Sequence, residues 1–258
     1  MPETLTSLQN PKIKDLLALE TQSRERKARG LFVVEGRREF ERARAAGFEP
    51  VTVFVREGEP DAPDADFVVS RHVYEKIAWR GSTEGIVAVM RVREILLEQI
   101  RLSAVPLILI LERVEKPGNL GAVLRSADAA GADAVLVCDP LTDLYNPNLI
   151  RASLGAVFSV PVVTCTSEEA SGWLKEHRIA VFAAQLQDSE VYYETDMTRP
   201  AAIVFGAEDK GLSEFWRRQA DAHVRIPMAG MMDSLNVSVS AAILVFEAVR
   251  QRNLKKAR

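Results

Sequence analysis

Residues 107–131 read LILILERVEKPGNLGAVLRSADAAG: an unbroken apolar run, a turn rich in glycine and proline, and then a helical pattern. An apolar run without polar alternation is typical of a strand in a parallel sheet that helices cover on both faces. Comparable runs follow at Ala134–Cys138, Val160–Val163, Ala180–Ala184 and Ala201–Phe205. Together they predict a central, mostly parallel α/β sheet. Ligands of such sheets bind beyond the carboxyl ends of the strands, so the segments after these runs form the candidate site.

The residues before Pro106 predict a second, smaller α/β unit with shorter elements. The pattern gives strands at residues 31–34, 51–55, 67–69 and 86–90, and helices at residues 8–20, 37–46 and 71–79. From residue 91 to residue 105 the sequence is charged and linker-like. We therefore expect a small domain at residues 1–92, a linker at 93–105 and a larger domain at 106–258.

The composition excludes several classes of protein. The chain has 258 residues, of which 47% are hydrophobic, which is enough for two domains with their own cores. It has no apolar run long enough to span a bilayer, and its start lacks the basic and then apolar order of a secretion signal. We expect a cytoplasmic protein with no membrane partner. Cys138, Cys165 and three scattered histidines offer neither a disulfide framework nor zinc-ligand spacing, so we expect no metal site.

The local distribution of charge matters more than the net charge of −3, because phosphate contacts need local positive potential. The window of residues 24–44 is net basic, and the tail after residue 249 carries basic residues without an acid among them. In the window, the basic residues are Arg24, Arg26, Lys27, Arg29, Arg37, Arg38, Arg42 and Arg44, against Glu25, Glu35, Glu39 and Glu41. Each segment is either a solvated surface or an RNA-binding one.

The turn after the first apolar run holds two candidate site residues. Asn119 either caps the following helix or points its amide into the cleft, and Arg125 lies one to two turns into that helix. A turn and helix after a first strand also occur in dinucleotide-binding folds. The glycines here form GNLG and not G-x-G-x-x-G, which disfavours a nicotinamide dehydrogenase.

Two later segments have the same strand, turn and helix order. In IVFGAEDKGLS, residues 203–213, an apolar strand stops at Gly206, and Glu208 lies at the mouth of a glycine-bounded loop. In RIPMAGMMDSLNVSVSAAILVFEAVRQR, residues 225–252, Ser234 or Asn236 caps a long helix. Apolar residues cover more than one face of this helix, which indicates either a core helix or one packed against a second subunit.

In this order and at these spacings, the three segments resemble the signature motifs of the SpoU/TrmH family of SPOUT RNA methyltransferases. The motifs are N-x-G with an arginine six residues after the asparagine, G-x-E-x-x-G-L, and I-P-M-x-G with S-L-N-V-S. LYNPNLIRASLGAVFSVPV, residues 144–162, resembles the family's linking segment. RGLFVVEGRREFERA and STEGIVAV resemble its RNA substrate-binding domain. Lys116 and Ser240 depart from the usual pattern, and neither is a residue expected to do chemistry.

The resemblance implies a SPOUT-type α/β domain with a C-terminal trefoil knot, preceded by a small α/β substrate-binding domain. It implies methylation of a ribose 2′-hydroxyl in RNA with S-adenosylmethionine as the cofactor. The implied catalytic residues are Arg125, Asn119, Glu208, Ser234 and Asn236. Those implied for cofactor binding are Gly206, Ile226, Met228 and Leu235. The expected RNA-binding residues are Arg24, Arg26, Lys27, Arg29, Arg37 and Arg151.

Ribosomal RNA is favoured over transfer RNA as the substrate, because family members that act on transfer RNA more often have short extensions. Methylation that confers antibiotic resistance and a non-catalytic RNA-binding role in ribosome assembly stay open as alternatives. We expect a homodimer built on the C-terminal helix, with Leu244 and Ala248 on its exposed face. We also expect the segment from about Pro106 onward to bind the cofactor on its own.

Overall fold

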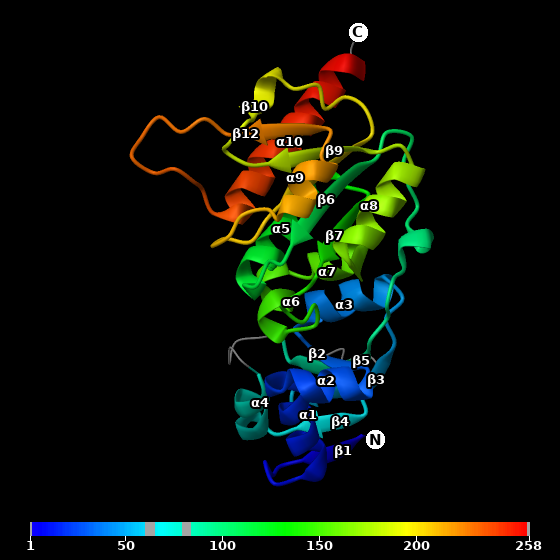
Figure 1. The fold of residues 1–258 in the computed structure, drawn as a ribbon. Coiled ribbons are helices and arrows are strands. Elements are labelled where there is room, and N and C mark those ends of the chain that lie inside the picture. The colour runs from blue at the N-terminus through cyan, green and yellow to red at the C-terminus, as the bar shows by residue number, and fades with distance from the viewer. Residues whose placement is uncertain (1, 60–64, 79–83, 257–258) are drawn as a thin grey trace. The chain divides into compact units, whose positions relative to one another are not determined.

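A computed structural model describes residues 2–59, 65–78 and 84–256. The chain forms two compact units, and most of their elements are labelled in Figure 1. The first comprises Met1–Arg93 and Asp143–Ser159, and the second comprises Glu94–Thr142 and Val160–Arg258. The expected division into a small domain at 1–92, a linker at 93–105 and a larger domain at 106–258 remains a prediction, because it concerns parts that fold independently. The compact units differ from these ranges chiefly at Asp143–Ser159, which packs with the first unit.

The first unit is built on a five-stranded sheet with the order β1-β4-β3-β5-β2. Its strands are β1 (Glu3–Leu5), β2 (Leu31–Glu35), β3 (Pro50–Arg56), β4 (Phe67–Val69) and β5 (Ile86–Arg91). Its helices are α1 (Pro11–Thr21), α2 (Ser23–Arg29), α3 (Arg37–Ala45), α4 (Arg71–Ile77), α6 (Pro147–Ser153) and α7 (Ala156–Ser159). Strand β5 is antiparallel to both β2 and β3, whereas β1 and β3 run parallel to β4.

One face of this sheet packs on α1 and α4, whose buried residues include Ile13, Leu16 and Ile77. An aromatic cluster from the Asp143–Ser159 segment explains why that segment belongs to this unit. Tyr145 stacks on Phe32 with ring centroids 4.4 Å apart. The predicted elements recur here with small shifts of their ends, while β1 and α2 were not predicted. Trp79, expected at the end of a helix, and the Ser82-Thr83 start of STEGIVAV lie outside the described residues.

The second unit is built on a seven-stranded sheet with the order β10-β12-β9-β11-β6-β7-β8, and all its paired strands are parallel. The strands are β6 (Leu107–Glu112), β7 (Ala134–Cys138), β8 (Val162–Cys165), β9 (Ala180–Ala184), β10 (Glu190–Val191), β11 (Ala201–Phe205) and β12 (Ala222–Arg225). Strands β6, β7 and β11 are buried along their whole length. The predicted parallel α/β sheet is therefore confirmed.

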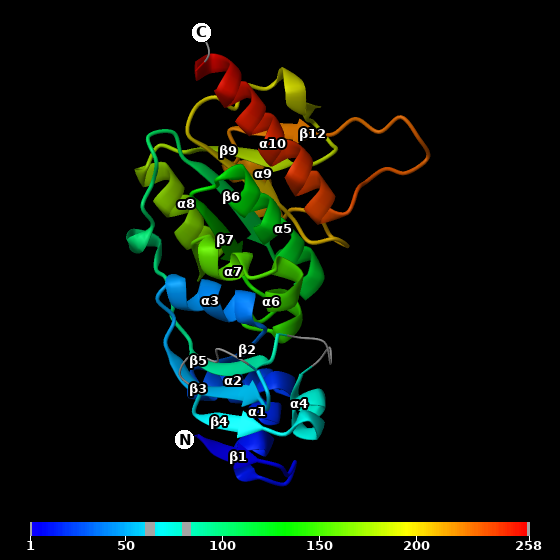
Figure 2. The same ribbon diagram turned by 180° about the vertical axis from the view of Figure 1, so that it is seen from behind.

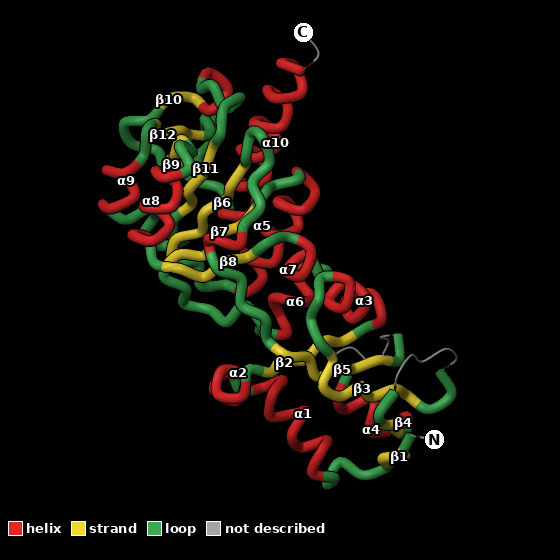
Figure 3. Tube along the Cα trace, turned by 90° about the vertical axis from the view of Figure 1, so that its right-hand side faces the viewer, coloured by secondary structure: helices red, strands yellow, loops and turns green. Residues whose placement is uncertain are grey.

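Helices cover both faces of this sheet. They are α5 (Pro117–Ala130), α8 (Ser167–Glu176), α9 (Glu214–Gln219) and α10 (Val237–Lys256), with short 3-10 turns η1 (Leu97–Gln99) and η2 (Tyr192–Glu194). Figure 3 shows α8 and α9 on one side of the sheet and α5 and α10 on the other. Trp173 of α8 and Trp216 of α9 belong to the core on their side. No helix within residues 2–59, 65–78 and 84–256 has both the length and the apolar character to cross a membrane.

Helix α10 lies beside α5, as Figure 2 shows, and this packing corrects one expectation. Leu244 and Ala248 were expected on the exposed face, but they are 1% and 0% exposed within the chain itself. The two positions are four residues apart, so they share one helix face, and that face is turned into the core. The exposed apolar side chains of α10 include instead Val239 and Phe246, at 45% and 44% exposed.

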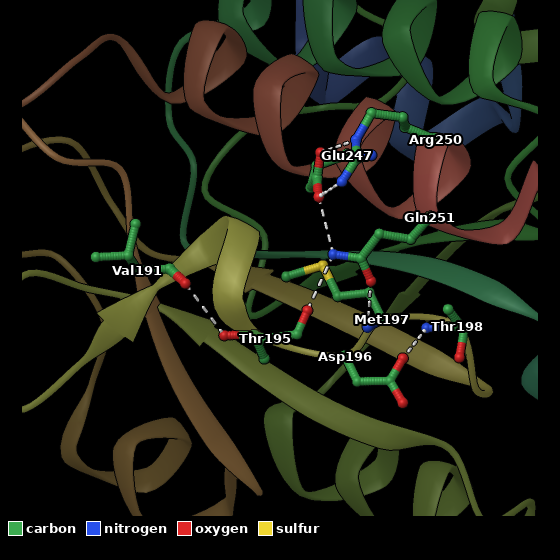
Figure 4. Close-up of polar contacts among 8 residues, drawn as sticks. All are labelled: Val191, Thr195, Asp196, Met197, Thr198, Glu247, Arg250 and Gln251. Carbon is green, nitrogen blue, oxygen red and sulfur yellow. Dashed lines mark hydrogen bonds and ion pairs between the residues drawn. The ribbon is translucent and has the colours of Figure 1, made fainter. Parts of the chain in front are cut away.

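The C-terminal half of α10 is fixed to the segment before β11 by polar contacts (Figure 4). Gln251 Nε2 donates to the Thr195 carbonyl at 3.0 Å, and Gln251 Oε1 accepts from the Met197 amide at 2.8 Å. At the next position, the Arg252 guanidinium donates to the carbonyls of Val105 and Pro106, which lead into β6. These bonds hold the helix in one register, which fixes the position of its N-terminus near the strand ends.

Candidate active site

A cavity of about 520 Å³ lies in the second unit at the carboxyl ends of β9, β11 and β12. These three strands are neighbours in the sheet, so the loops that follow them meet at one edge. The N-terminal turns of α10 complete the wall. The predicted cofactor-binding residues all line this cavity, and they are Gly206, Ile226, Met228 and Leu235. That these residues bind S-adenosylmethionine stays a prediction.

The glycine at the end of β11 is required by a close approach of backbone. A Cβ atom at Gly206 would collide with the backbone of Gly211 and Leu212. The loop returns on itself because the Gly211 amide donates to the Ala207 carbonyl at 2.9 Å. Gly211 itself has a φ of +65°, a conformation that side chains other than glycine rarely adopt. The loop therefore presents main-chain atoms to the cavity and places Glu208 between two tight bends.

Three of the predicted catalytic residues form one hydrogen-bonded network. Asn119 Nδ2 donates to Glu208 Oε1, and Asn236 Nδ2 donates to Asn119 Oδ1 at 3.1 Å. Asn236 Oδ1 accepts from the Ser238 amide at 2.9 Å, so Asn236 also caps α10. Because each amide has partners of defined donor and acceptor character, the orientation of both amides is fixed. The network joins the start of α5, the loop after β11 and the start of α10.

The other two predicted catalytic residues lie outside this network. Ser234 is exposed and lines the cavity, and its hydroxyl donates to the neighbouring Asp233 carboxylate at 3.3 Å. Arg125 is exposed on α5. Within the described part of the chain, its guanidinium has no side-chain hydrogen bond or ion pair. Arg125 is therefore available to a substrate but is not held by the polar residues of the network.

Sequence reasoning missed Glu112, which fixes the far end of the Gly206–Leu212 loop. This carboxylate is 3% exposed, and its Oε2 accepts from the Ser213 amide at 2.8 Å. A buried carboxylate needs hydrogen bonds of this kind to offset its lost hydration. The only signal in the sequence is an acidic residue that directly ends an apolar strand.

Gln185, at the end of β9, is a second residue that was missed. It lines the cavity, and its Nε2 donates to the Gln187 carbonyl at 2.8 Å. This bond fixes the orientation of the amide, because only the nitrogen donates. The opposite atom, Oε1, is buried and has no hydrogen-bond partner among the described residues. The wall of the cavity therefore contains an acceptor whose hydrogen bond is not made by any of the described residues.

In the first unit, the predicted RNA-binding residues differ in exposure and in their partners. Arg26 is 4% exposed, and its guanidinium donates to the Asp143 carboxylate at 2.7 Å and to the Leu19 carbonyl at 2.7 Å. Such a residue holds the fold and does not reach a surface ligand in this conformation. Arg24 and Lys27 are exposed and have no polar side-chain partner in the described part of the unit.

The other predicted RNA-binding residues include two with acidic partners. Arg29 makes two bonds to the exposed Asp15 carboxylate, and these bonds lower the pKa of Asp15. Arg151 donates to Glu35, which is 8% exposed. Burial, reinforced by repulsion from Glu35, raises the pKa of the neighbouring Glu20 to about 8. Arg37 is half-buried at the start of α3.

Comparison with protein families gives two matches that divide the chain. Residues 106–246 match the SpoU rRNA Methylase family, and residues 10–88 match the MRM3-like substrate binding domain. A relative from Pseudomonas putida, the 23S rRNA (guanosine-2′-O-)-methyltransferase RlmB, is 37% identical over 190 residues. That alignment covers 70% of this chain and 77% of the relative.

Solved structures match over nearly the whole chain. An RNA 2′-O ribose methyltransferase is 43% identical, with a TM-score of 0.85 over 97% of this chain and 99% of the other. An AdoMet-bound rRNA methyltransferase from Sinorhizobium meliloti is 31% identical, with a TM-score of 0.88 over 96% of this chain and 97% of the other. The family model matches more than half of the chain and includes every residue of the polar network. The chain therefore belongs to the SpoU rRNA methylase family.

Proposed function

We propose that this protein transfers the methyl group of S-adenosylmethionine to a ribose 2′-hydroxyl of ribosomal RNA. The observation that carries this proposal is the Asn119–Glu208–Asn236 network beside a ligand-sized cavity, in a chain of the SpoU rRNA methylase family. The relative from Pseudomonas putida is named for 23S rRNA. The match to a substrate-binding domain supports a separate unit that holds the RNA, and a ribosomal RNA substrate supports a cytoplasmic location.

The cavity fits the cofactor. Its volume of about 520 Å³ lies within the range of about 300–1,000 Å³ found for small-ligand sites. Main-chain groups of Gly206, Ile226, Met228 and Leu235 would hold the adenosine, and the buried Gln185 Oε1 supplies an acceptor that needs a donor. When bound, the cofactor supplies an electrophilic methyl group on a sulfonium. The C-terminal knot implied by the family resemblance belongs to this proposal.

Arg125 stabilises the attacking oxygen. A neutral ribose hydroxyl is a weak nucleophile, and the pKa of an arginine, above about 12, makes a neutral guanidinium an expensive base. We assign Arg125 to positioning the hydroxyl and its neighbouring phosphate and to stabilising the negative charge that develops on the oxygen. Its exposure and its lack of a polar partner in the described part of the chain leave the guanidinium available for this role.

The Asn119–Glu208–Asn236 network positions the reacting groups. It joins the start of α5 to the loop after β11 and to the start of α10, which both border the cavity. The ribose and the methyl group are thereby held in one geometry. Correct alignment of two reactants supplies a large share of the acceleration in such reactions. Ser234, at the mouth of the same cavity, is a direct contact for the ribose.

The first unit holds the RNA through its exposed cations. Arg24 and Lys27 carry this role best, because neither has an acidic partner in the described residues. Arg29, Arg37 and Arg151 add to the local positive potential, whereas Arg26 supports the fold.

The protein acts as a homodimer through α10. Val239 and Phe246 are exposed and lie seven residues apart, with the partly buried Ala242 and Ile243 between them. This spacing makes one apolar stripe along the helix, and a second copy of the same surface is the commonest cover for it. The active site would then lie close to the partner chain.

Two measurements test the proposed function. Calorimetric titration of the full-length protein should detect binding of S-adenosylmethionine but not of NAD. Incubation with the cofactor and with purified ribosomal or transfer RNA, followed by mass spectrometry, should find a 2′-O-methyl group in ribosomal RNA. Methylation of transfer RNA alone would replace the proposed substrate. Cofactor binding without any transfer would favour a non-catalytic RNA-binding factor.

A further inference from the structure

Basic side chains from four separate elements line the cavity of the second unit. Lys116 precedes α5, Lys210 lies in the loop after β11, Arg217 belongs to α9, and Arg225 ends β12. Glu208 is the only acidic residue among the described residues that line this cavity. Its carboxylate already accepts a hydrogen bond from Asn119.

None of these four cations is neutralised within the described part of the chain. Lys116, Lys210, Arg217 and Arg225 have no side-chain hydrogen bond or ion pair there. In contrast, Arg218, which follows Arg217 on α9, forms an ion pair with Glu214 at 2.8 Å. A cluster of like charges in a cavity with low-dielectric walls focuses the positive potential toward an incoming anion.

The charge of this cluster does not match the cofactor. S-adenosylmethionine carries a sulfonium, an ammonium and one carboxylate, so its net charge is positive. A cavity with a surplus of positive side chains would not by itself attract it. An RNA strand carries one negative charge per nucleotide. We propose that Arg217 and Arg225, supported by Lys116 and Lys210, hold a backbone phosphate of the RNA next to the target ribose.

The proposal rests on the proposed function, and the positions of the two arginines give it a mechanism. Arg225 directly precedes Ile226 of the predicted cofactor loop, and Arg217 lies on the helix that follows the Gly206–Leu212 loop. A planar guanidinium donates two parallel hydrogen bonds to phosphate oxygens, which fixes orientation as well as position. The walls of one cavity would then hold both the phosphate and the cofactor. This arrangement presents the 2′-hydroxyl of the target ribose to the methyl group.

The test compares the full-length R217A/R225A double variant with the matched control R218A, which removes a neighbouring arginine of α9 that does not line the cavity. For the double variant, the KM for RNA should rise about tenfold or more. The logarithm of its RNA affinity should also depend less steeply on the logarithm of salt concentration, with the slope smaller by about 0.7 for each phosphate that the variant no longer neutralises. Calorimetry should give an affinity for S-adenosylmethionine within twofold of wild type. R218A should leave all three quantities near the wild-type values.

Three results would overturn the proposal. An unchanged KM and salt dependence would mean that these arginines do not contact RNA. A large reduction in cofactor affinity would assign them to the carboxylate of S-adenosylmethionine. Equal effects for R218A would mean that general surface charge is responsible. Absence of methyl transfer by the wild-type protein would instead overturn the proposed function, and the salt dependence of RNA binding would still decide this inference.

Discussion

Asn236 donates a side-chain hydrogen bond to Asn119 at 3.1 Å, so the residue that caps α10 also orients the amide at the start of α5. The same Asn119 amide donates to Glu208 in the loop after β11. One side chain therefore connects three loops that are distant in the sequence. A change at Asn119 should act on all of them at once.

Replacing Asn119 with Asp removes the donor to Glu208 and sets two carboxylates side by side. The added carboxylate repels Glu208, so the loop shifts and methyl transfer should fall about 100-fold. The measurement is kcat/KM for RNA. The R218A variant, which changes a residue that does not line the cavity, should keep the wild-type value. A wild-type kcat/KM for N119D would remove the network from the mechanism.

Replacing Arg125 with Ala should abolish detectable methyl transfer and leave cofactor affinity within a few-fold of wild type. Arg125 acts on the RNA and on the charge that develops in the transition state, and not on the cofactor, so its loss lowers kcat and leaves ground-state binding of the cofactor intact. R125K should also fail, because a point charge does not bridge hydroxyl and phosphate as a planar fork does. Single-turnover transfer and calorimetry give the two quantities. Substantial activity in either variant would move the catalytic role to another residue.

Replacing Phe246 with Glu should convert the dimer to a monomer and reduce activity. This side chain is 44% exposed within one chain, and a charge there opposes burial under a second copy. Light scattering at micromolar concentration reports the mass. Leu141→Glu is the matched control, because Leu141 is 51% exposed and does not belong to α10. A wild-type protein that is monomeric and active would contradict the dimer.

Protonation of Glu20 should make stability depend on pH. Its pKa is raised from 4.5 to about 8 in the folded protein, so the folded chain binds an extra proton between these values. The free energy of unfolding should then fall as pH rises from about 4.5 to about 8, by at most about 1.4 kcal/mol per pH unit. Urea unfolding at pH 5.5 and pH 8.5 measures the difference, and E20Q should reduce it.

The control for Glu20 is Asp15→Asn. Arg29 lowers the pKa of Asp15 below 3.8, so the stability that this carboxylate contributes is lost only as pH falls through that lowered value. D15N should therefore lower the free energy of unfolding equally at pH 5.5 and pH 8.5. An E20Q variant with the wild-type pH dependence would show that another group titrates.

The central sheet could be predicted because its strands are long and apolar on both faces. Leu107–Glu112 and Ala201–Phe205 are fully buried, so no surface requirement interrupts their pattern. Strand β10 has only two residues, Glu190 and Val191, and leaves no such pattern. The exposed face of α10 was also mispredicted. Apolar residues lie on more than one side of this helix, and only its packing shows which of them are covered.

The chemistry of the site could be predicted better than its contacts. The motif resemblance identified Asn119, Glu208 and Asn236, but the partners of Asn119 are 89 and 117 residues away in the sequence. Arg26 was assigned to RNA because it lies in a basic window. Its partner Asp143 is 117 residues distant, and no local pattern reveals such a pair.

The measurement that tests the account most directly is a map of ribose methylation in total RNA from cells with and without the gene. Mass spectrometry should find one 2′-O-methyl nucleotide in ribosomal RNA that disappears when the gene is removed. Wild-type protein should restore it, and the R125A variant should not. An unchanged map, or restoration by R125A, would contradict the assignment of this chain as a ribosomal RNA ribose methyltransferase that acts through Arg125.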